Sequence, residues 1–422
     1  MMEKQTKIGT VPKGWEVKKL KEVFHINELS LPSNTDANYK FKYIPIEFVT
    51  TNHIDYENCE AFRFVDAPGR ARRIVRENDI LVSGVRPNLK SFAVFKKPDD
   101  SNWICSTGFY VLTAKDESDN LFSYYELLSE IGESQFYSYV AGSNYPAIGD
   151  GDIRNMKLMF PKDKSEQSAI AAILSKVDEA IAAVQASISA AERLKKSLMQ
   201  NLLTGRMKPD GTLRTEEEFY LEEKFGKVPV GWEVKRLGYL FNIKAGGDLQ
   251  EDYYSPIKDS THAYPVFSNS LDNNGLYGYT SNPRFHAKES VTITGRGGVG
   301  HPEYRRGDYD AIIRLISLIP LQPDTIDCKY ICYYIGHYVH FALESTGVPQ
   351  LTCPKVFSTK IMIPIDVKEQ NKIGEIIHHF DAYITEKQNK IAILERLKKS
   401  LMQNLLTGRV RMTKKMIIDD NQ

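Results

Sequence analysis

The strongest constraint on this chain of 422 residues is a stretch of sequence that occurs twice. Residues 192–206 read ERLKKSLMQNLLTGR, and residues 395–409 repeat all 15 of them without a change, 203 positions later. A second pair of stretches, 11–20 and 228–237, shares the pattern Val-Pro-x-Gly-Trp-Glu-Val-Lys at an offset of 217 positions. The chain is therefore a tandem duplication whose variable parts have diverged while their borders have not.

Each copy of the repeat ends a long stretch with the period of a helix. In the first copy, apolar residues recur with a mean step near 3.6, and no Gly or Pro lies between Ser165 and Thr204. A helix of that span would be roughly 60 Å long, and a one-sided helix of this length needs a partner. The copy from Lys368 through Leu406 is the obvious partner, so we expect two long antiparallel, coiled-coil-like helices in a pseudo-twofold repeat. The lysine pairs at 195–196 and 398–399 are expected on their solvated face.

The variable parts are expected to be globular α+β domains. Strand-like runs occur between about Phe41 and Ala114, residues 121–140 have helical spacing, and a short strand at 157–160 closes the first domain. The second half repeats this order. The predicted division is 1–161 for the first globular domain, 162–206 for its long helix, 207–227 for a linker, 228–364 for the second globular domain, 365–409 for its helix and 410–422 for a tail.

The composition indicates the cellular compartment but does not identify the ligand. No stretch approaches 18 apolar residues and the N-terminus carries no apolar signal region, so the chain is expected to be cytoplasmic, without a membrane partner. The five cysteines form no C-x-x-C pair, which indicates reduced thiols. With 55 basic and 54 acidic residues, the net charge of +1 gives no sign of nucleic acid, so only local clustering can.

Two motifs that could carry catalytic or cofactor chemistry have simpler interpretations. Residues 295–300, GRGGVG, fit the dinucleotide fingerprint after a strand, but another strand follows where that fingerprint requires a helix. A glycine-rich hairpin whose backbone comes close to another segment is favoured. Residues 282–285, Asn-Pro-Arg-Phe, resemble the tetrapeptide of adenine methyltransferases, but a plain turn is favoured because no doubly wound domain surrounds it.

A cluster of cysteines and histidines could suggest a metal site, but the sequence does not favour one. Its candidate ligands are two cysteines and two histidines whose spacing fits neither a zinc knuckle nor a finger: Cys328, Cys332, His337 and His340. They lie on what the sequence predicts to be a half-buried helix. No catalytic triad, P-loop or carboxylate pair is evident either, so we expect a binding protein with no catalytic residue, cofactor or metal of its own.

Local clusters of basic residues point to nucleic acid. Between Phe62 and Asp99 nine basic residues face four acidic ones, and the segment from Arg284 to Arg314 has six against four. Lys and Arg bind phosphates, Arg also reads guanine, and Asn or Gln reads adenine. A merely solvated basic surface remains the alternative for each residue.

These borders resemble the specificity (S) subunits of type I restriction-modification enzymes. The resemblance covers nearly the whole chain and rests on the Pro-x-Gly-Trp-Glu-Val openings, the Pro and Glu-Gln runs at 159–167 and 362–370, and the duplicated helix ends. It implies two target recognition domains that read a bipartite double-stranded DNA site, and helices that act as spacers. It also implies docking of two methyltransferase (modification) subunits that bind S-adenosylmethionine and methylate adenine N6, and of restriction subunits that use ATP and Mg.

The resemblance supplies no fixed motif for base-reading residues, so the candidates rest on their position in loops. They are Arg86, Asn88, Lys90, Asn144 and Tyr145 in the first domain, and Asn269, Asn274, Arg296, His301 and Tyr304 in the second. The candidates for docking partner subunits are Leu194, Leu198, Leu202, Leu397, Leu401 and Leu405. Because the two domains have diverged, the DNA site should be asymmetric. A type II specificity subunit and a helical scaffold that does not read DNA are the alternatives.

Overall fold

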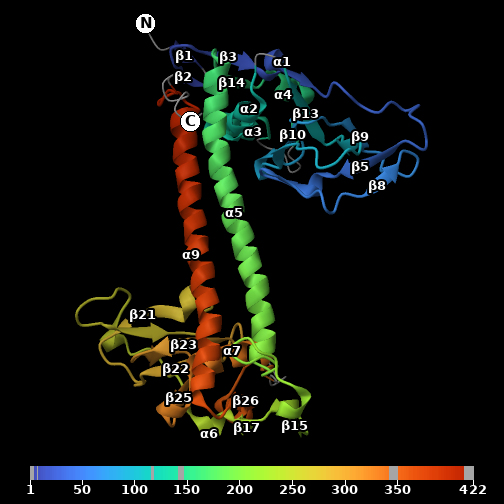
Figure 1. Ribbon diagram of the computed structural model, residues 1–422. Coiled ribbons are helices and arrows are strands. Elements are labelled where there is room, and N and C mark those ends of the chain that lie inside the picture. The colour runs from blue at the N-terminus through green and yellow to red at the C-terminus, as the bar shows by residue number, and fades with distance from the viewer. Residues whose placement is uncertain (1–3, 7, 116–117, 141–146, 342–349, 413–422) are drawn as a thin grey trace. The chain divides into compact units, whose positions relative to one another are not determined.

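The chain folds into two compact units. The computed structural model describes residues 4–6, 8–115, 118–140, 147–341 and 350–412. Unit 1 comprises Met1–Val184 and Lys390–Gln422, and unit 2 comprises Gln185–Asn389. Two helices of 39 residues, α5 (Lys164–Leu202) and α9 (Val367–Leu405), are the longest elements (Figure 1). Each contributes its beginning to one unit and its end to the other.

Unit 1 contains two four-stranded sheets. The first has the order β4 (Phe24–Ile26), β13 (Phe109–Ala114), β10 (Ile80–Ser83), β11 (Phe92–Val94), and all neighbours are antiparallel. The second has the order β8 (Ala61–Arg63), β5 (Lys40–Ile44), β12 (Trp103–Ser106), β9 (Ala71–Ile74). In that sheet β5 and β12 are parallel. Short strands β1 (Lys4–Thr6), β2 (Gly9–Val11), β6 (Val49–Thr50) and β7 (His53–Ile54) form two further hairpins.

Unit 2 repeats the strand order and directions of the first sheet although its sequence has diverged, whereas its second sheet is arranged differently. Its first sheet has the order β18 (Phe241–Ala245), β25 (Ile316–Pro320), β22 (Glu289–Ile293), β23 (Pro302–Arg306). Its second has the order β19 (Tyr254–Ser255), β21 (Leu276–Thr280), β20 (Tyr264–Phe267), β24 (Asp310–Ala311), and β20 is parallel to β24. The expected α+β domains in tandem are confirmed, and the duplication extends into their variable parts.

Each unit also carries shorter helices, four in unit 1 and three among the described residues of unit 2. In unit 1 these are α1 (Leu20–Val23), α2 (Asn120–Leu128), α3 (Glu130–Val140) and α4 (Asp150–Asn155); in unit 2 they are α6 (Leu237–Leu240), α7 (Cys328–Tyr338) and α8 (Cys353–Ser358). The single helix expected over 121–140 is broken, because Ser129 is extended and its hydroxyl accepts a hydrogen bond from the Gly132 amide. None of the helices described is long and apolar enough to cross a bilayer.

The two duplicated motifs pack against each other. The Trp-bearing strands β3 (Trp15–Lys19) and β17 (Trp232–Arg236) pair with β14 (Lys157–Pro161) and β26 (Lys360–Pro364), which lead into the long helices. Gly205 and Gly408 end α5 and α9 with φ of +67° and +64°. A Cβ at Gly408 would lie 2.5 Å from Pro12 Cγ, and one at Gly205 would lie 2.3 Å from Pro229 Cγ. Only glycine fits at both contacts.

Within each unit the beginning of one long helix lies against the end of the other. In unit 1, Lys398 on α9 forms an ion pair of 2.6 Å with Asp178 on α5, and Tyr125 on α2 donates to the same carboxylate at 2.8 Å. Unit 2 repeats this Tyr–Asp–Lys cluster with Tyr333, Asp381 and Lys195. The expectation that Lys195 and Lys398 are solvated is therefore wrong, because the facing helix presents an aspartate to each. Their neighbours Lys196 and Lys399 are exposed.

The segment 207–227, expected to be a linker, has structure of its own. It contains β15 (Phe219–Glu222), which pairs with β16 (Gly226–Pro229) as a hairpin. Its Arg214 forms an ion pair with Glu369 near the beginning of α9. In unit 1, Arg411 just beyond the end of α9 pairs with Glu166 through two contacts of 2.6 and 2.7 Å. Residues 413–422 of the expected tail lie outside the described part of the chain.

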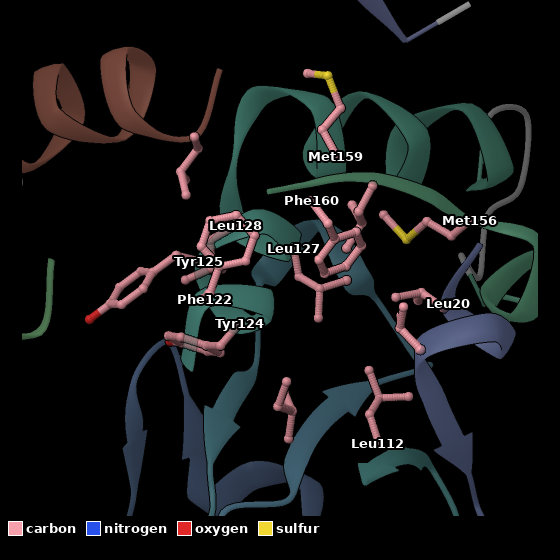
Figure 2. Close-up of a cluster of buried hydrophobic side chains, with 14 of the residues drawn as sticks. Leu20, Leu112, Phe122, Tyr124, Tyr125, Leu127, Leu128, Met156, Met159 and Phe160 are labelled. Atoms are coloured by element: carbon pink, nitrogen blue, oxygen red, sulfur yellow. The ribbon is translucent and has the colours of Figure 1, made fainter. Parts of the chain in front are cut away.

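The core of unit 1 surrounds α2 (Figure 2). Phe122, Leu127, Phe160 and Leu20 are buried there, whereas the Tyr125 hydroxyl points away from the cluster, as its bond to Asp178 requires. Glu126 on the same helix is fully buried, and neither carboxyl oxygen has a hydrogen-bond partner among the described residues. Burial raises the pKa of Glu126 well above its usual range. The folded unit therefore favours the neutral form of this carboxyl.

The Tyr–Asp–Lys cluster predicts a matched pair of stability effects. Lys398→Met should lower the free energy of unfolding by about 2 kcal/mol, between the values for exposed and fully buried ion pairs, because Asp178 loses its counter-charge. The side chains of Lys398 and Asp178 are only 17% and 11% exposed. Lys399→Met, one residue along in the same helix, should change little. Equal losses for the two variants in urea denaturation would contradict a specific role for the ion pair.

Glu126 predicts a stability that falls as pH rises. A carboxyl whose pKa is raised by folding contributes its full stability below the pKa of the unfolded chain, about 4.3, and loses it at higher pH at up to about 1.4 kcal/mol per pH unit. Glu126→Gln should therefore stabilise the protein more at pH 8 than at pH 5, measured by urea denaturation at both values. Glu57→Gln, at an exposed glutamate, is the control. A gain that does not depend on pH would refute a neutral Glu126.

Candidate nucleic-acid interface

Two loops with basic residues, 84–91 between β10 and β11 and 294–301 between β22 and β23, lie at equivalent places in the two units. In unit 1 the loop follows β10, and the Gly84 carbonyl accepts the Ile148 amide at 2.8 Å. In unit 2 it follows β22, and the Gly295 carbonyl accepts the Leu351 amide at 2.9 Å. In each case a glycine within two residues of the strand's end is hydrogen-bonded to the chain segment that precedes β14 or β26. The same fold thus presents two loops of different sequence.

In unit 1 the loop is held in an unusual backbone conformation. Arg86 and Lys90 have φ of +50° and +51° and flank a short 3-10 turn, Pro87–Leu89. Arg86 and Asn88 are exposed, whereas Lys90 is half-buried and forms a 3.0 Å ion pair with Glu133 on α3. The Lys90 charge is therefore partly neutralised within the unit, which weakens it as a base reader. Asn144 and Tyr145 lie outside the described residues.

In unit 2 the glycine-rich segment forms the hairpin between β22 and β23. These strands pair from Glu289 opposite Arg306 to Ile293 opposite Pro302, so no helix follows the glycines and the dinucleotide interpretation fails. A Cβ at Gly295 would lie 2.8 Å from the Arg314 carbonyl, and one at Gly298 would lie 2.6 Å from Leu271 Cδ1. The expected close approach of this backbone to other segments is confirmed.

Asn269 holds this hairpin in place. Its side-chain oxygen accepts the Gly295 amide at 2.7 Å, and its side-chain nitrogen donates to the Ile313 carbonyl. Both ends of the amide are therefore occupied by backbone groups, which leaves one N–H and one lone pair. The geometry gives Asn269 a structural role instead of the base-reading role expected from the sequence.

Arg296 meets a glutamine that the sequence did not single out. Its Nη2 and Nε donate to Gln350 Oε1 at 3.0 and 3.3 Å. Both residues line a polar cavity of about 610 Å³, together with residues 245–248, Arg314 and the segment 351–354. The cavity also holds one carboxylate, that of the exposed Asp248. Arg296 thus lies in a cavity that is lined by hydrogen-bond donors and acceptors.

The other candidates of unit 2 do not share this cavity. Asn274 is exposed on the 3-10 turn Asp272–Gly275, where Asn273 and Asn274 have φ of +48° and +51°. His301 contacts Glu303 at 3.1 Å, and Tyr304 donates to Glu289 at 2.7 Å. Since these two side chains are engaged by carboxylates of the same sheet, they are weaker candidates than Arg296.

The remaining motifs have structural roles. Arg284 of the Asn-Pro-Arg-Phe turn makes two bonds of 2.7 and 2.8 Å to Asp310, which is 1% exposed, and this supports the turn interpretation. Cys328, Cys332 and His337 lie on the half-buried helix α7, as expected, and His340 follows it. Within the described residues no group of side chains has an arrangement that could hold a metal ion.

The six leucines expected to dock partners divide in the same way in both copies. Leu202 and Leu405 are 0% and 3% exposed and belong to the cores of their units, so that expectation is wrong for them. Leu198 and Leu401 are partly buried against the same cores. Leu194 and Leu397 are 51% and 46% exposed, which makes them the available pair.

Arg314 and Gln350 are the candidate residues that sequence reasoning missed. Arg314 was counted only as part of a basic segment. Gln350 directly follows Pro349, which aligns with Pro146 at the 203-residue offset. The counterpart of Gln350 in the first half is therefore Ala147. That difference, directly after an aligned proline, is the signal that could have pointed to it.

Comparison with known proteins shows the family of the chain. The model of the type I restriction modification DNA specificity domain matches residues 12–193 and 229–396. The chain is 25% identical to a putative type I restriction enzyme specificity subunit, MjaX, of Methanocaldococcus jannaschii, over 97% of this chain and 96% of that protein. The MjaIX specificity subunit of the same organism is 22% identical over the same shares.

Solved structures share the fold. The type I restriction-modification S subunit from M. genitalium has a TM-score of 0.61 at 17% identity and covers 96% of this chain and 99% of that one. A chain from a structural study of assembly and conformational transition of the type I system has a TM-score of 0.51 at 22% identity, over 95% and 99%. With two matches that cover most of its length, the chain belongs to the type I restriction-modification DNA specificity family and carries two copies of the family's domain.

Proposed function

We propose that this chain reads an asymmetric, two-part duplex DNA site, one part with each unit. The observation that carries the proposal is the repetition of one four-stranded sheet with different loops: the Arg86 loop after β10 and the Arg296 loop after β22. Equivalent frames with unlike side chains at the same place should read unlike sequences.

The chain should act without chemistry of its own. We propose that its partners are two methyltransferase subunits that bring S-adenosylmethionine, and restriction subunits that bring ATP and Mg. Leu194 and Leu397, exposed at identical places in the duplicated sequence, are the residues best suited to bind two copies of one partner. Identical surfaces on a duplicated chain favour identical partners.

The spacing of the two DNA parts should depend on the long helices. Neither α5 nor α9 is interrupted where one unit gives way to the other, between Val184 and Gln185 and between Asn389 and Lys390. A type II specificity subunit would share these features and differ only in its partner. A helical scaffold explains the helices but not the matched basic loops.

The length of the helices gives a quantitative prediction. Inserting seven residues after both Val184 and Asn389 lengthens each helix by about 10.5 Å and preserves its face. The chain, purified in complex with a methyltransferase subunit, should select from random duplexes a two-part site whose gap is about 3 base pairs longer than that of the wild type, at roughly 3.4 Å per base pair.

An insertion in α5 alone is the control, because it breaks the match between the two helices and should impair binding. A wild-type complex that selects no sequence would favour the scaffold alternative. An unchanged gap in the double insertion would show that the helices do not set the spacing.

A further inference from the structure

We infer that the polar cavity of unit 2 is its base-reading pocket, in which Arg296, Arg314 and Gln350 contact base edges and Asn269 positions them. This inference rests on the proposed function, since it presupposes that unit 2 reads DNA. The cavity, of about 610 Å³, is bordered by residues of four separate chain segments: 245–248, Arg296, Ile313 with Arg314 and Ile316, and 350–354. It therefore has a defined shape and is not a patch on one loop.

Backbone hydrogen bonds fix these segments to one another. The Ile313 amide donates to the Gly247 carbonyl at 2.9 Å, the Arg314 amide to Gly246 at 3.2 Å, and the Gly246 amide to Leu315 at 2.8 Å. A Cβ at Gly246 would lie 2.3 Å from the Ala311 carbonyl, so this approach requires glycine. Asn269 joins the Gly295 segment to the Ile313 segment, because it bonds both, and the Leu351 amide donates to the Gly295 carbonyl at 2.9 Å.

The chain adopts a costly conformation at this place. Ile313 and Arg314 are consecutive, are not glycine, and have φ of +54° and +61°. A left-handed conformation is a genuine outlier for a β-branched residue, and such strain persists where the surroundings impose it, often at binding sites. Ile313 is nevertheless 51% exposed, so burial of its side chain does not compensate for the cost. Its methyl groups are available to a partner such as the thymine methyl group.

The polar side chains suit base edges. Arg296 and Gln350 are already bonded to each other, so part of the cost of ordering them is met before DNA binds. Among the described residues no carboxylate pairs with Arg296 or Arg314, and Gln350 Nε2 has no hydrogen-bond partner. Arginine donors match guanine, and Gln350 Nε2 can donate to an acceptor on a base edge such as adenine N7. The Asp248 carboxylate at the rim disfavours a phosphate there and can accept from cytosine.

The test compares variants of the complex formed with the methyltransferase subunit, by selection from random duplexes and by affinity for the selected site and for unrelated DNA. Arg314→Ala and Gln350→Ala should each weaken binding to the selected site about 10- to 100-fold, leave binding to unrelated DNA nearly unchanged and relax one position in one half of the site. The other half should stay as in the wild type. Arg236→Ala, at an exposed arginine outside the cavity, should change neither.

Asn269→Asp tests the positioning role. An aspartate can still accept the Gly295 amide but cannot donate to the Ile313 carbonyl, so the same half of the site should lose specificity at more than one position. If this variant does not fold, Ile313→Asn replaces it, because asparagine tolerates the left-handed conformation and should change recognition while stability is kept or raised.

The outcomes separate the two claims. A wild-type complex without sequence preference refutes the proposed function itself. A wild-type complex that reads a two-part site, together with Arg314→Ala and Gln350→Ala complexes that select the same site, overturns the pocket alone. Equal losses on selected and unrelated DNA also overturn it, because they would mark these residues as phosphate contacts.

Discussion

The packing of each long-helix end against a Pro-x-Gly-Trp turn is the contact on which the rest of the structure depends. Gly205 meets Pro229 and Trp232, and Gly408 meets Pro12 and Trp15. A single Cβ at either glycine would collide with the proline ring, and the left-handed φ at both positions excludes most other residues as well. The turns and the helix ends therefore depend on each other for their packing. This explains why both keep the same sequence in the two halves of the chain while the sequence between them diverges.

The framework of the fold could be predicted from the sequence because it is local and repeated. The helical period before Gly205, the strands around Leu81 and Val111, and the antiparallel pairing of the helices all follow from patterns of apolar residues. What the patterns missed is the identity of partners across space. Lys398 is charged and is expected from the sequence on the solvated face of its helix, but it pairs with Asp178, which also accepts from Tyr125, and both partners come from other elements. Leu202 and Leu405 match the helix stripe but belong to the cores at its ends.

The place of Arg296 in the fold could be predicted from the sequence, but the residues around it could not. The sequence placed Arg296 in a glycine-rich hairpin that approaches other segments, and the structure agrees. It could not distinguish a residue that contacts bases from one that positions the backbone. Asn269 and Asn274 are the same residue type, and of the two only Asn269 is hydrogen-bonded to described residues at both ends of its side-chain amide. Nor could it foresee that Gln350 and Arg314, 36 positions apart, border one recess. The geometry of the loops decides both the role of Asn269 and the proximity of Gln350 to Arg314, and loops have no periodic sequence pattern from which their geometry could be predicted.

The most direct test of the central claim is to sequence host DNA with a method that detects modified bases, with this gene intact and with it deleted, in cells that express the partner methyltransferase. The account predicts that an asymmetric, two-part N6-methyladenine motif is present with the intact gene and vanishes on deletion. Methylation that persists unchanged after deletion would contradict it, because the chain would then not direct the methyltransferase to its sites.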